Sequence, residues 1–397
     1  MSERRQARNG AVPLRVVTRA AALPEVAAAV LAGPAPSAPG AWAEIEPATL
    51  IAPAALATRL DGRLGGPSPA PDAVRGLHGA RQGPLALCRV REAFFLPRFG
   101  AVIDEDGQVF GPTVGETLSW NPDLAALPGV RARGEARLFT PPRSAPSLAG
   151  ATVFVAKGGE FNYGHFLLDC LPALLSAHEL GLTSALPPLA PPLKPWSRDL
   201  LAYAFPDLAV RETRAPVVRL EEAAFSTAMN HFLHHPTPLL TRLRARILAG
   251  APAGRGAARV YISRRAYPMR VMVNEPALEA ALAARGFHIV RAERVSVAEQ
   301  IALMREAEVV VGATGAGLAN ALFAPEGAKV FEIQPETFTS TWLRDLTGLT
   351  GADWHGYFCP APVRASEAAW TYRIRRGFRW AYRLPLEDFL GFLDARL

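Results

Sequence analysis

A polar triplet in the first half of the chain has the spacing needed for proton transfer. Within GGEFNYGHFLLDCLPALL, Asn162, His165 and Asp169 follow at intervals of three and four residues, on one face of a helix that begins after a glycine turn. An imidazole held by a carboxylate one turn away can act as a general base. Alternatively, Asn162 caps the helix while His165 and Asp169 satisfy each other in the core. This segment alone leaves both interpretations open.

A basic segment in the second half has the side chains for binding phosphate. YISRRAYPMRVMVNE places Arg264, Arg265 and Arg270 just beyond a predicted strand, where open α/β sheets bind their ligands. Arginine makes forked, charge-assisted hydrogen bonds to phosphate oxygens, so Arg264 and Arg265 could clamp a diphosphate. For Arg265, a solvated basic loop explains the sequence equally well. Asn274 is placed to cap the following helix.

A glycine-rich turn, GATGAG at 312–317, lies between a buried strand and a helix. Glycine lets the backbone approach a phosphate, and the helix start presents free N–H groups. With Glu332 twenty residues further on as a ribose-binding acid, the turn also fits a dinucleotide-binding oxidoreductase. Two βα units precede this turn, however, and few residues follow Glu332, which argues against that fold. A turn used only for tight packing is the third interpretation.

The elements around these residues predict an α/β fold. In the second half, strands at 259–263, 287–290, 308–311 and 329–333 alternate with helices, which calls for a parallel sheet. Ser296 and Glu299 form a capping box for one of these helices. The first half predicts a hairpin at Asp106-Gly107, a strand at 151–156, strand-like material at 209–228, and helices at 162–180, 197–205 and 238–248.

We expect four parts along the chain. They are a flexible N-terminal arm at 1–40 with a short helix near 25–31, an N-terminal α/β domain at 41–249, a C-terminal α/β domain at 250–380, and a terminal helix at 381–397. The linker is AGAPAGRGAA at 249–258. The last helix carries an apolar stripe that must be buried against another part of the protein, and one candidate for that part is the N-terminal domain.

Composition excludes several classes of protein. Half of the 397 residues are hydrophobic and a fifth are charged, which argues against disorder. The net charge of +7 comes from scattered arginines, so we expect no nucleic-acid partner. Three distant cysteines give neither a disulfide framework nor a zinc motif, and HFLHH at 231–235 is more typical of a surface loop than of a metal site. No segment has the length of a membrane helix.

Four separated segments resemble glycosyltransferase family 61, once described as a capsular-polysaccharide-biosynthesis domain. They are FNYGHFLLDCLPALL, YISRR with the following Arg and NE, SVAEQIALMREAEVVVGATGAGLANALFAP, and VFEI, and together they cover roughly residues 85–335. The resemblance implies a GT-B fold of two Rossmann-like domains facing a central cleft, with 41–249 as the acceptor-side domain and 250–380 as the nucleotide-sugar-binding domain. It also implies an inverting mechanism without an obligatory metal or other cofactor, and a nucleotide-sugar donor, expected to be UDP-linked, in the second domain.

One position departs from the family pattern. Where the family usually has His-Gly-Ala-Gly-Leu, this chain has Thr314 in place of the histidine. A hydroxyl can donate to a phosphate oxygen but carries no positive charge. The remaining glycines and the arginines favour an active enzyme, while a catalytically impaired relative that only binds nucleotide sugar is the alternative.

The residues and the resemblance together predict a site. We expect His165 as base, oriented by Asp169, with Asp169 itself as the alternative base, and Asn162 and Asn274 in supporting positions. The expected donor-binding residues are Arg264, Arg265, Arg270, Thr314, Gly315, Ala316, Gly317, Leu318 and Glu332, the last holding the ribose. The expected acceptor is a glycan or a lipid-linked polysaccharide. We expect the protein in the cytoplasm, where its positive charge also fits peripheral association with the inner face of the cell membrane.

Overall fold

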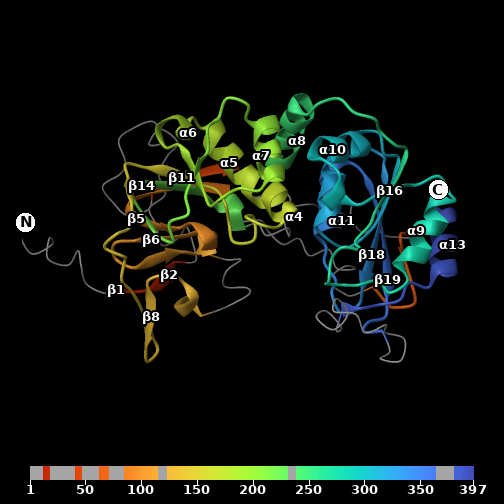
Figure 1. Cartoon of the computed structure of the whole chain (residues 1–397), viewed down its shortest axis with the longest axis horizontal. Coiled ribbons are helices and arrows are strands. Elements are labelled where there is room, and N and C mark those ends of the chain that lie inside the picture. Colours follow the sequence, from red (N-terminus) through yellow and green to blue (C-terminus); the bar gives the residue numbers. More distant parts are fainter. Residues whose placement is uncertain are drawn as a thin grey trace, which may run out of the picture. The chain divides into compact units, whose positions relative to one another are not determined.

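The computed structural model describes residues 12–17, 41–46, 62–70, 85–114, 123–230, 238–363 and 380–397. The chain divides into two compact units, one of Met1–Thr49 with Gln82–Phe232 and one of Leu50–Arg81 with Leu233–Leu397. Each unit has its own main sheet (Figure 1). The second unit therefore takes up residues 50–81 and 233–249, which the sequence had assigned to the N-terminal domain.

The first unit is built on a mixed ten-stranded sheet. Its main path runs β13 (Arg211–Glu212), β12 (Pro188–Ala190), β11 (Ala151–Val153), β14 (Val218–Ser226), β5 (Leu85–Leu96), β6 (Ala101–Asp104), β7 (Gln108–Phe110) and β2 (Arg15–Val17). Off this path, β10 (Ser147–Leu148) pairs with β14 and β3 (Ala41–Glu46) pairs with β5. Strands β11 to β14 pair in parallel, whereas β14, β5, β6 and β7 are antiparallel. The predicted hairpin is confirmed, with Gly107 at a φ of 79° between β6 and β7.

A small sheet and several helices complete the first unit. The sheet has the order β1 (Val12–Pro13), β9 (Ala136–Phe139), β8 (Val130–Arg133). Because β1 and β2 are paired strands, residues 12–17 are not the loose arm that the sequence predicted; the helix predicted near 25–31 lies outside the described residues. The helices are α4 (Tyr163–His165), the π-helix η6 (Phe166–Cys170), α5 (Leu171–Glu179), α6 (Leu182–Ala185) and α7 (Pro195–Ala204), and the 3-10 turns are η4 (Pro97–Phe99), η5 (Leu124–Ala126) and η7 (Thr227–Asn230).

The second unit contains the predicted parallel sheet. Its order is β16 (His288–Val290), β15 (Arg259–Ile262), β17 (Val309–Ala313), β18 (Lys329–Pro335), β19 (Asp353–Cys359) and β4 (Leu64–Gly65), all paired in parallel. The first five strands follow the doubly wound order 2-1-3-4-5. After β16 the chain crosses β15 to form β17, so the direction of winding reverses between β15 and β17.

Helices cover both faces of this second sheet (Figure 1). Helices α9 (Glu275–Ala283) and α13 (Leu386–Asp394) lie on one side, and α10 (Val297–Arg305) and α11 (Trp342–Thr350) on the other. The helix α8 (Pro238–Gly250) and the 3-10 helix η9 (Ala316–Phe323) pack with α11, and a further 3-10 turn, η8 (Ala292–Arg294), precedes α10. The apolar stripe of α13 joins the core of this sheet through Phe389, Leu390 and Leu393, so the second unit, and not the N-terminal domain, buries it.

Candidate functional site

The turn that leads into the His165 helix is built for close packing. A Cβ on Gly159 would come within 2.4 Å of Cys170 Sγ, so glycine lets the turn lie against the helix it precedes. Asn162 then caps α4, because its Oδ1 accepts from the Gly164 and His165 N–H groups at 2.9 and 3.4 Å. Aromatic contacts of Tyr163 and Phe166 with Trp196 fix the helix start further. Asn162 thus caps the helix, as the structural alternative drawn from the sequence predicted.

His165 and Asp169 contact each other as their spacing predicts. His165 Nδ1 lies 2.9 Å from Asp169 Oδ2, and both side chains are buried. The contact spans the π-helical turn η6, which the sequence did not predict. A carboxylate on Nδ1 orients the ring and leaves Nε2 as the nitrogen that can accept a proton.

A second group of polar residues gathers in the other unit, where β15 and β17 end. Ligands of open α/β sheets bind at the carboxyl ends of the strands, at the point where the winding reverses. Arg264 follows β15 and Gly315 follows β17, and they lie against each other: a Cβ on Gly315 would stand 1.6 Å from Arg264 Nη1. The sequence-predicted pairing of Arg264 with the glycine turn is therefore present in the fold.

Arg270 is the second cation at this place. Its guanidinium lies over the Phe338 ring at 4.2 Å, and its backbone has a φ of 55°, which is unusual for a residue with a side chain. Burial and the neighbouring Arg264 charge lower the pKa of Arg270 to about 9. Burial also lowers the pKa of Arg264. The two guanidinium groups thus lie within electrostatic range of each other, and both are buried.

Each of these two arginines has one N–H group without a hydrogen-bond partner. Among the residues that the structure describes, the buried Nε atoms of Arg264 and Arg270 have no hydrogen-bond partner, and neither does the buried hydroxyl of Tyr382. Buried polar groups are almost always satisfied, so three unpartnered donors in one region indicate a place built for an acceptor. We call Arg264, Arg270, Gly315 and Tyr382 the switch-point site.

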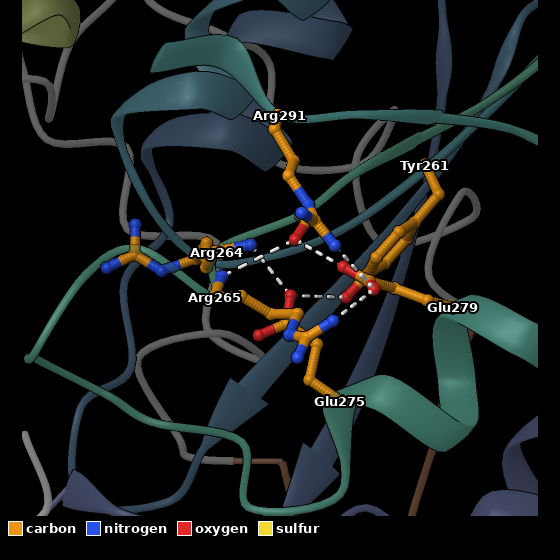
Figure 2. A network of polar contacts seen from close by, with 7 residues as sticks. Tyr261, Arg264, Arg265, Glu275, Glu279 and Arg291 are labelled. Carbon is orange, nitrogen blue, oxygen red and sulfur yellow. Dashed lines mark hydrogen bonds and ion pairs between the residues drawn. The ribbon is translucent and has the colours of Figure 1, made fainter. Parts of the chain in front are cut away.

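Arg265 points elsewhere (Figure 2). Its Nη1 lies 3.0 Å from Glu279 Oε2, which Arg291 also contacts, and Glu279 Oε1 accepts from the Ser263 hydroxyl at 2.6 Å. Arg264 and Arg265 therefore do not converge on the glycine turn. Consecutive residues at the end of a strand point to opposite sides, which explains the separation.

A buried carboxylate, Glu275, holds the backbone of Arg264. Its Oε1 accepts from the Tyr261 hydroxyl at 2.9 Å and from the Arg264 N–H at 2.6 Å (Figure 2). Burial raises the pKa of Glu275. No role was predicted for Glu275 from the sequence. Glu275 and Glu279 lie four residues apart in a helix that follows two arginines, and these complementary charges are the signal that could have pointed to this network.

Two other predicted residues, Asn274 and Leu318, are placed differently from expectation. Asn274 stands at the start of α9 without capping it; its side chain exchanges two hydrogen bonds with the Leu384 backbone, at 2.8 and 2.9 Å. The Leu318 N–H donates to the Gly315 carbonyl at 2.9 Å, and the Leu318 side chain is buried. Only Ala316 and Gly317 are left to offer the first N–H groups of η9.

Glu332 is entirely buried, so as placed it offers no surface to a ribose. Its Oε2 accepts from Trp354 Nε1 and Gln334 Nε2 at 2.9 and 2.8 Å. Burial raises the pKa of Glu332 to about 7, against hydrogen bonds from Thr314, Trp354 and Gln334 and the charge of Arg270, which lower it. Thr314, also buried, thus faces Glu332, and the carboxyl group acts as a neighbour of Arg270 inside the protein.

The histidines of HFLHH lie outside the described residues. Within the described ranges, no group of three or more His, Cys, Asp and Glu side chains could hold a metal ion. The helices traced in those ranges include none that is both long enough and apolar enough to cross a membrane.

Comparison with known protein families gives a match over part of the chain. The model of the Glycosyltransferase 61 family matches residues 163–331, which includes His165, Asp169, Arg264, Arg270 and the glycine turn. This match confirms the resemblance found in the sequence. No curated protein matches the chain.

Proposed function

Because residues 163–331 match the glycosyltransferase 61 family, we propose that the protein transfers a sugar from a nucleotide-sugar donor to a glycan acceptor. The observation that carries this proposal is the pair of buried arginines with unpartnered Nε atoms beside the glycine turn. A buried guanidinium N–H without a hydrogen-bond partner is costly, and phosphate oxygens accept the forked hydrogen bonds that guanidinium groups make. A nucleoside diphosphate supplies two such anionic groups.

The switch-point site is the proposed place of the diphosphate. Arg264 and Arg270 would neutralise its charge, with the N–H groups of Ala316 and Gly317 at the start of η9 contributing the positive end of the helix. As the sugar leaves the donor, negative charge develops on the departing diphosphate, and groups already in place stabilise it most effectively. Arg265 has no part in this, since Glu279 already holds it.

His165 is the proposed base. Its Nε2 takes the proton of the acceptor hydroxyl while the acceptor oxygen bonds to the anomeric carbon and the bond from that carbon to the diphosphate oxygen breaks. Attack opposite the leaving group inverts the configuration. Asp169, 2.9 Å from Nδ1, orients the ring and stabilises the imidazolium that forms.

The arrangement of the domains, the donor and the acceptor are proposed from the family match. The two units would be the two domains of a GT-B enzyme, the first supplying the base and the second the donor site. We propose a UDP-linked donor, no metal or other cofactor, and an acceptor of the capsule or cell-surface polysaccharide type, lipid-linked and used on the cytoplasmic side of the membrane.

Ligand-dependent stability tests this proposal most directly. Thermal unfolding would be followed with UDP, GDP, CMP, UDP-sugars and NAD(P), because a ligand that binds only the folded state stabilises it by about 2.7 kcal/mol at a hundredfold excess over its Kd. We expect a shift with one nucleoside diphosphate that disappears in Arg264→Ala. A shift with NAD(P) alone would contradict the proposal. Donor consumption on adding acceptor then separates an active transferase from a relative that only binds.

A further inference from the structure

Tyr382 is the least expected member of the switch-point site. It lies outside the residues that match the family model, and its side chain is fully buried. Its hydroxyl is buried too and has no hydrogen-bond partner in the part of the chain that the structure describes. A buried tyrosine normally gives its hydroxyl a partner, because an unsatisfied polar group costs about 1 to 3 kcal/mol.

The backbone holds Tyr382 firmly in this position. Its N–H donates to the Val271 carbonyl at 3.0 Å, and its carbonyl accepts from the Val273 N–H at 2.9 Å. The two hydrogen bonds between Asn274 and Leu384 extend this pairing by two residues. Tyr382 is thus fixed beside the segment that carries Arg270, and its ring packs in the core with Met272 and Tyr357.

Two other buried tyrosines in the same core show what is missing. The Tyr261 hydroxyl donates to Glu275 at 2.9 Å, and the Tyr357 hydroxyl donates to Asp388 at 2.5 Å. A phenylalanine at position 382 would fill the same space without an unpartnered hydroxyl. The hydroxyl therefore calls for a partner that the free protein does not supply.

The surroundings define that partner. Arg264 and Arg270 both influence the ionisation of Tyr382, so the phenol lies within electrostatic range of the two guanidinium groups. Each arginine has an unpartnered Nε, and arginine can only donate. Two carboxylates, Glu275 and Glu332, also act on these groups, but neither forms a hydrogen bond with the three unpartnered atoms. A group that satisfies all three must be an acceptor, and phosphate oxygens are acceptors that guanidinium groups bind well. We infer that Tyr382 donates a hydrogen bond to a phosphate oxygen of the bound donor, as a donor-binding residue of the proposed transferase, an inference that rests on the proposed function.

Tyr382→Phe removes only the hydroxyl and keeps the packing. Its binding would be measured by titration calorimetry with UDP and with inorganic pyrophosphate, which presents the diphosphate without sugar or base. We expect about tenfold weaker binding of both ligands, the effect of losing one good hydrogen bond to a charged group. The unliganded variant should melt no lower than the wild type, because the hydroxyl it loses is unpartnered.

Tyr357→Phe is the matched control, since it loses a hydroxyl that already has a partner, Asp388. It should bind both ligands like the wild type and melt at a slightly lower temperature. Unchanged ligand affinity in Tyr382→Phe, with affinity lost in Arg264→Ala, would overturn the inference and leave the proposed function standing. A wild-type protein that binds no nucleoside diphosphate, no nucleotide sugar and no pyrophosphate would remove both.

Discussion

The guanidinium of Arg264 lies directly against the backbone of Gly315, across the point where the second sheet changes its direction of winding. A Cβ atom on Gly315 would lie 1.6 Å from Arg264 Nη1, which is too close for two nonbonded atoms. The backbone of Gly315 is extended, at a φ of 162°, so another residue could adopt it. Glycine is required here for space and not for conformation.

Gly315→Ala should therefore displace Arg264 without unfolding the protein, because the atom in conflict is the end of a flexible side chain. We expect at least a tenfold loss of affinity for UDP, measured by calorimetry, with a melting temperature near the wild type. Gly348→Ala in α11 is the control, since a Cβ there meets no atom within 4 Å. Equal affinity in Gly315→Ala and Gly348→Ala would place the phosphate away from this turn.

Arg264 and Arg265 should differ although they are neighbours in sequence. Arg264→Ala removes a cation of the switch-point site, so UDP affinity should fall tenfold or more. Arg265→Ala removes one of three partners of Glu279, and its half-exposed ion pair is worth at most about 1 kcal/mol. We expect its Kd to stay within about threefold of the wild type, the effect of about 0.65 kcal/mol. Equal losses in the two variants would show that both contact the ligand.

Glu275 should act on the site through Arg264. In Glu275→Gln the amide oxygen can still accept from Tyr261 and from the Arg264 N–H, so stability and UDP affinity should remain close to the wild type. Glu275→Ala leaves both donors unsatisfied and should cost about 1 to 3 kcal/mol in urea unfolding. Its UDP affinity should also fall. A Gln variant as impaired as the Ala variant would mean that the charge, and not the hydrogen bonds, matters.

The parts of the fold that local sequence determines were predictable. The strand runs and caps of the second half, such as Ser296 with its oxygen 3.2 Å from the Glu299 N–H, follow from patterns a few residues long. Strand pairings between segments that are far apart in the sequence leave no such local pattern. The edge strand β4 joins β19 from almost 300 residues away, and Tyr382 pairs beside Met272 across 110 residues.

The candidate site was predictable to a similar degree. Spacing alone brought His165 to Asp169, since one helical turn separates them. The choice between Arg264 and Arg265 depends on which side of a strand end each faces, and the burial of Glu332 depends on Trp354 from the neighbouring strand. Neither could be known before the register of the sheet was known.

His165 and Asp169 should affect transfer and not donor binding. His165→Ala should lower the transfer rate by about 10²- to 10⁴-fold, the usual contribution of a general base, with UDP affinity unchanged. Asp169→Asn should lose less, because it keeps a side chain that can hold the ring. His178→Ala is the control, a histidine further along the same helical segment whose Nδ1 contacts Thr183. If Asp169→Asn had no transfer activity while His165→Ala kept it, Asp169 would be the base.

Glu332 should make stability depend on pH. Its pKa is raised from an ordinary 4.5 to about 7 in the folded protein, so below pH 4.5 it is protonated in both states and has no effect. Between pH 4.5 and 7 the unfolded chain releases this proton and the folded protein keeps it, so stability falls as pH rises. Above pH 7 the loss is complete, at about 3 kcal/mol from the 1.36 kcal/mol that each pKa unit represents.

Glu332→Gln removes the titration and keeps an oxygen for Trp354. In urea unfolding, the stability of the variant relative to the wild type should rise steadily from pH 5 to pH 7 and then level off. Burial sets the upper end of this range, and the Arg270 charge brings it down because it favours the ionised carboxylate. Arg270→Ala should therefore move the plateau to higher pH. Parallel stability curves for Glu332→Gln and the wild type would mean that Glu332 ionises in the folded protein as readily as in the unfolded chain.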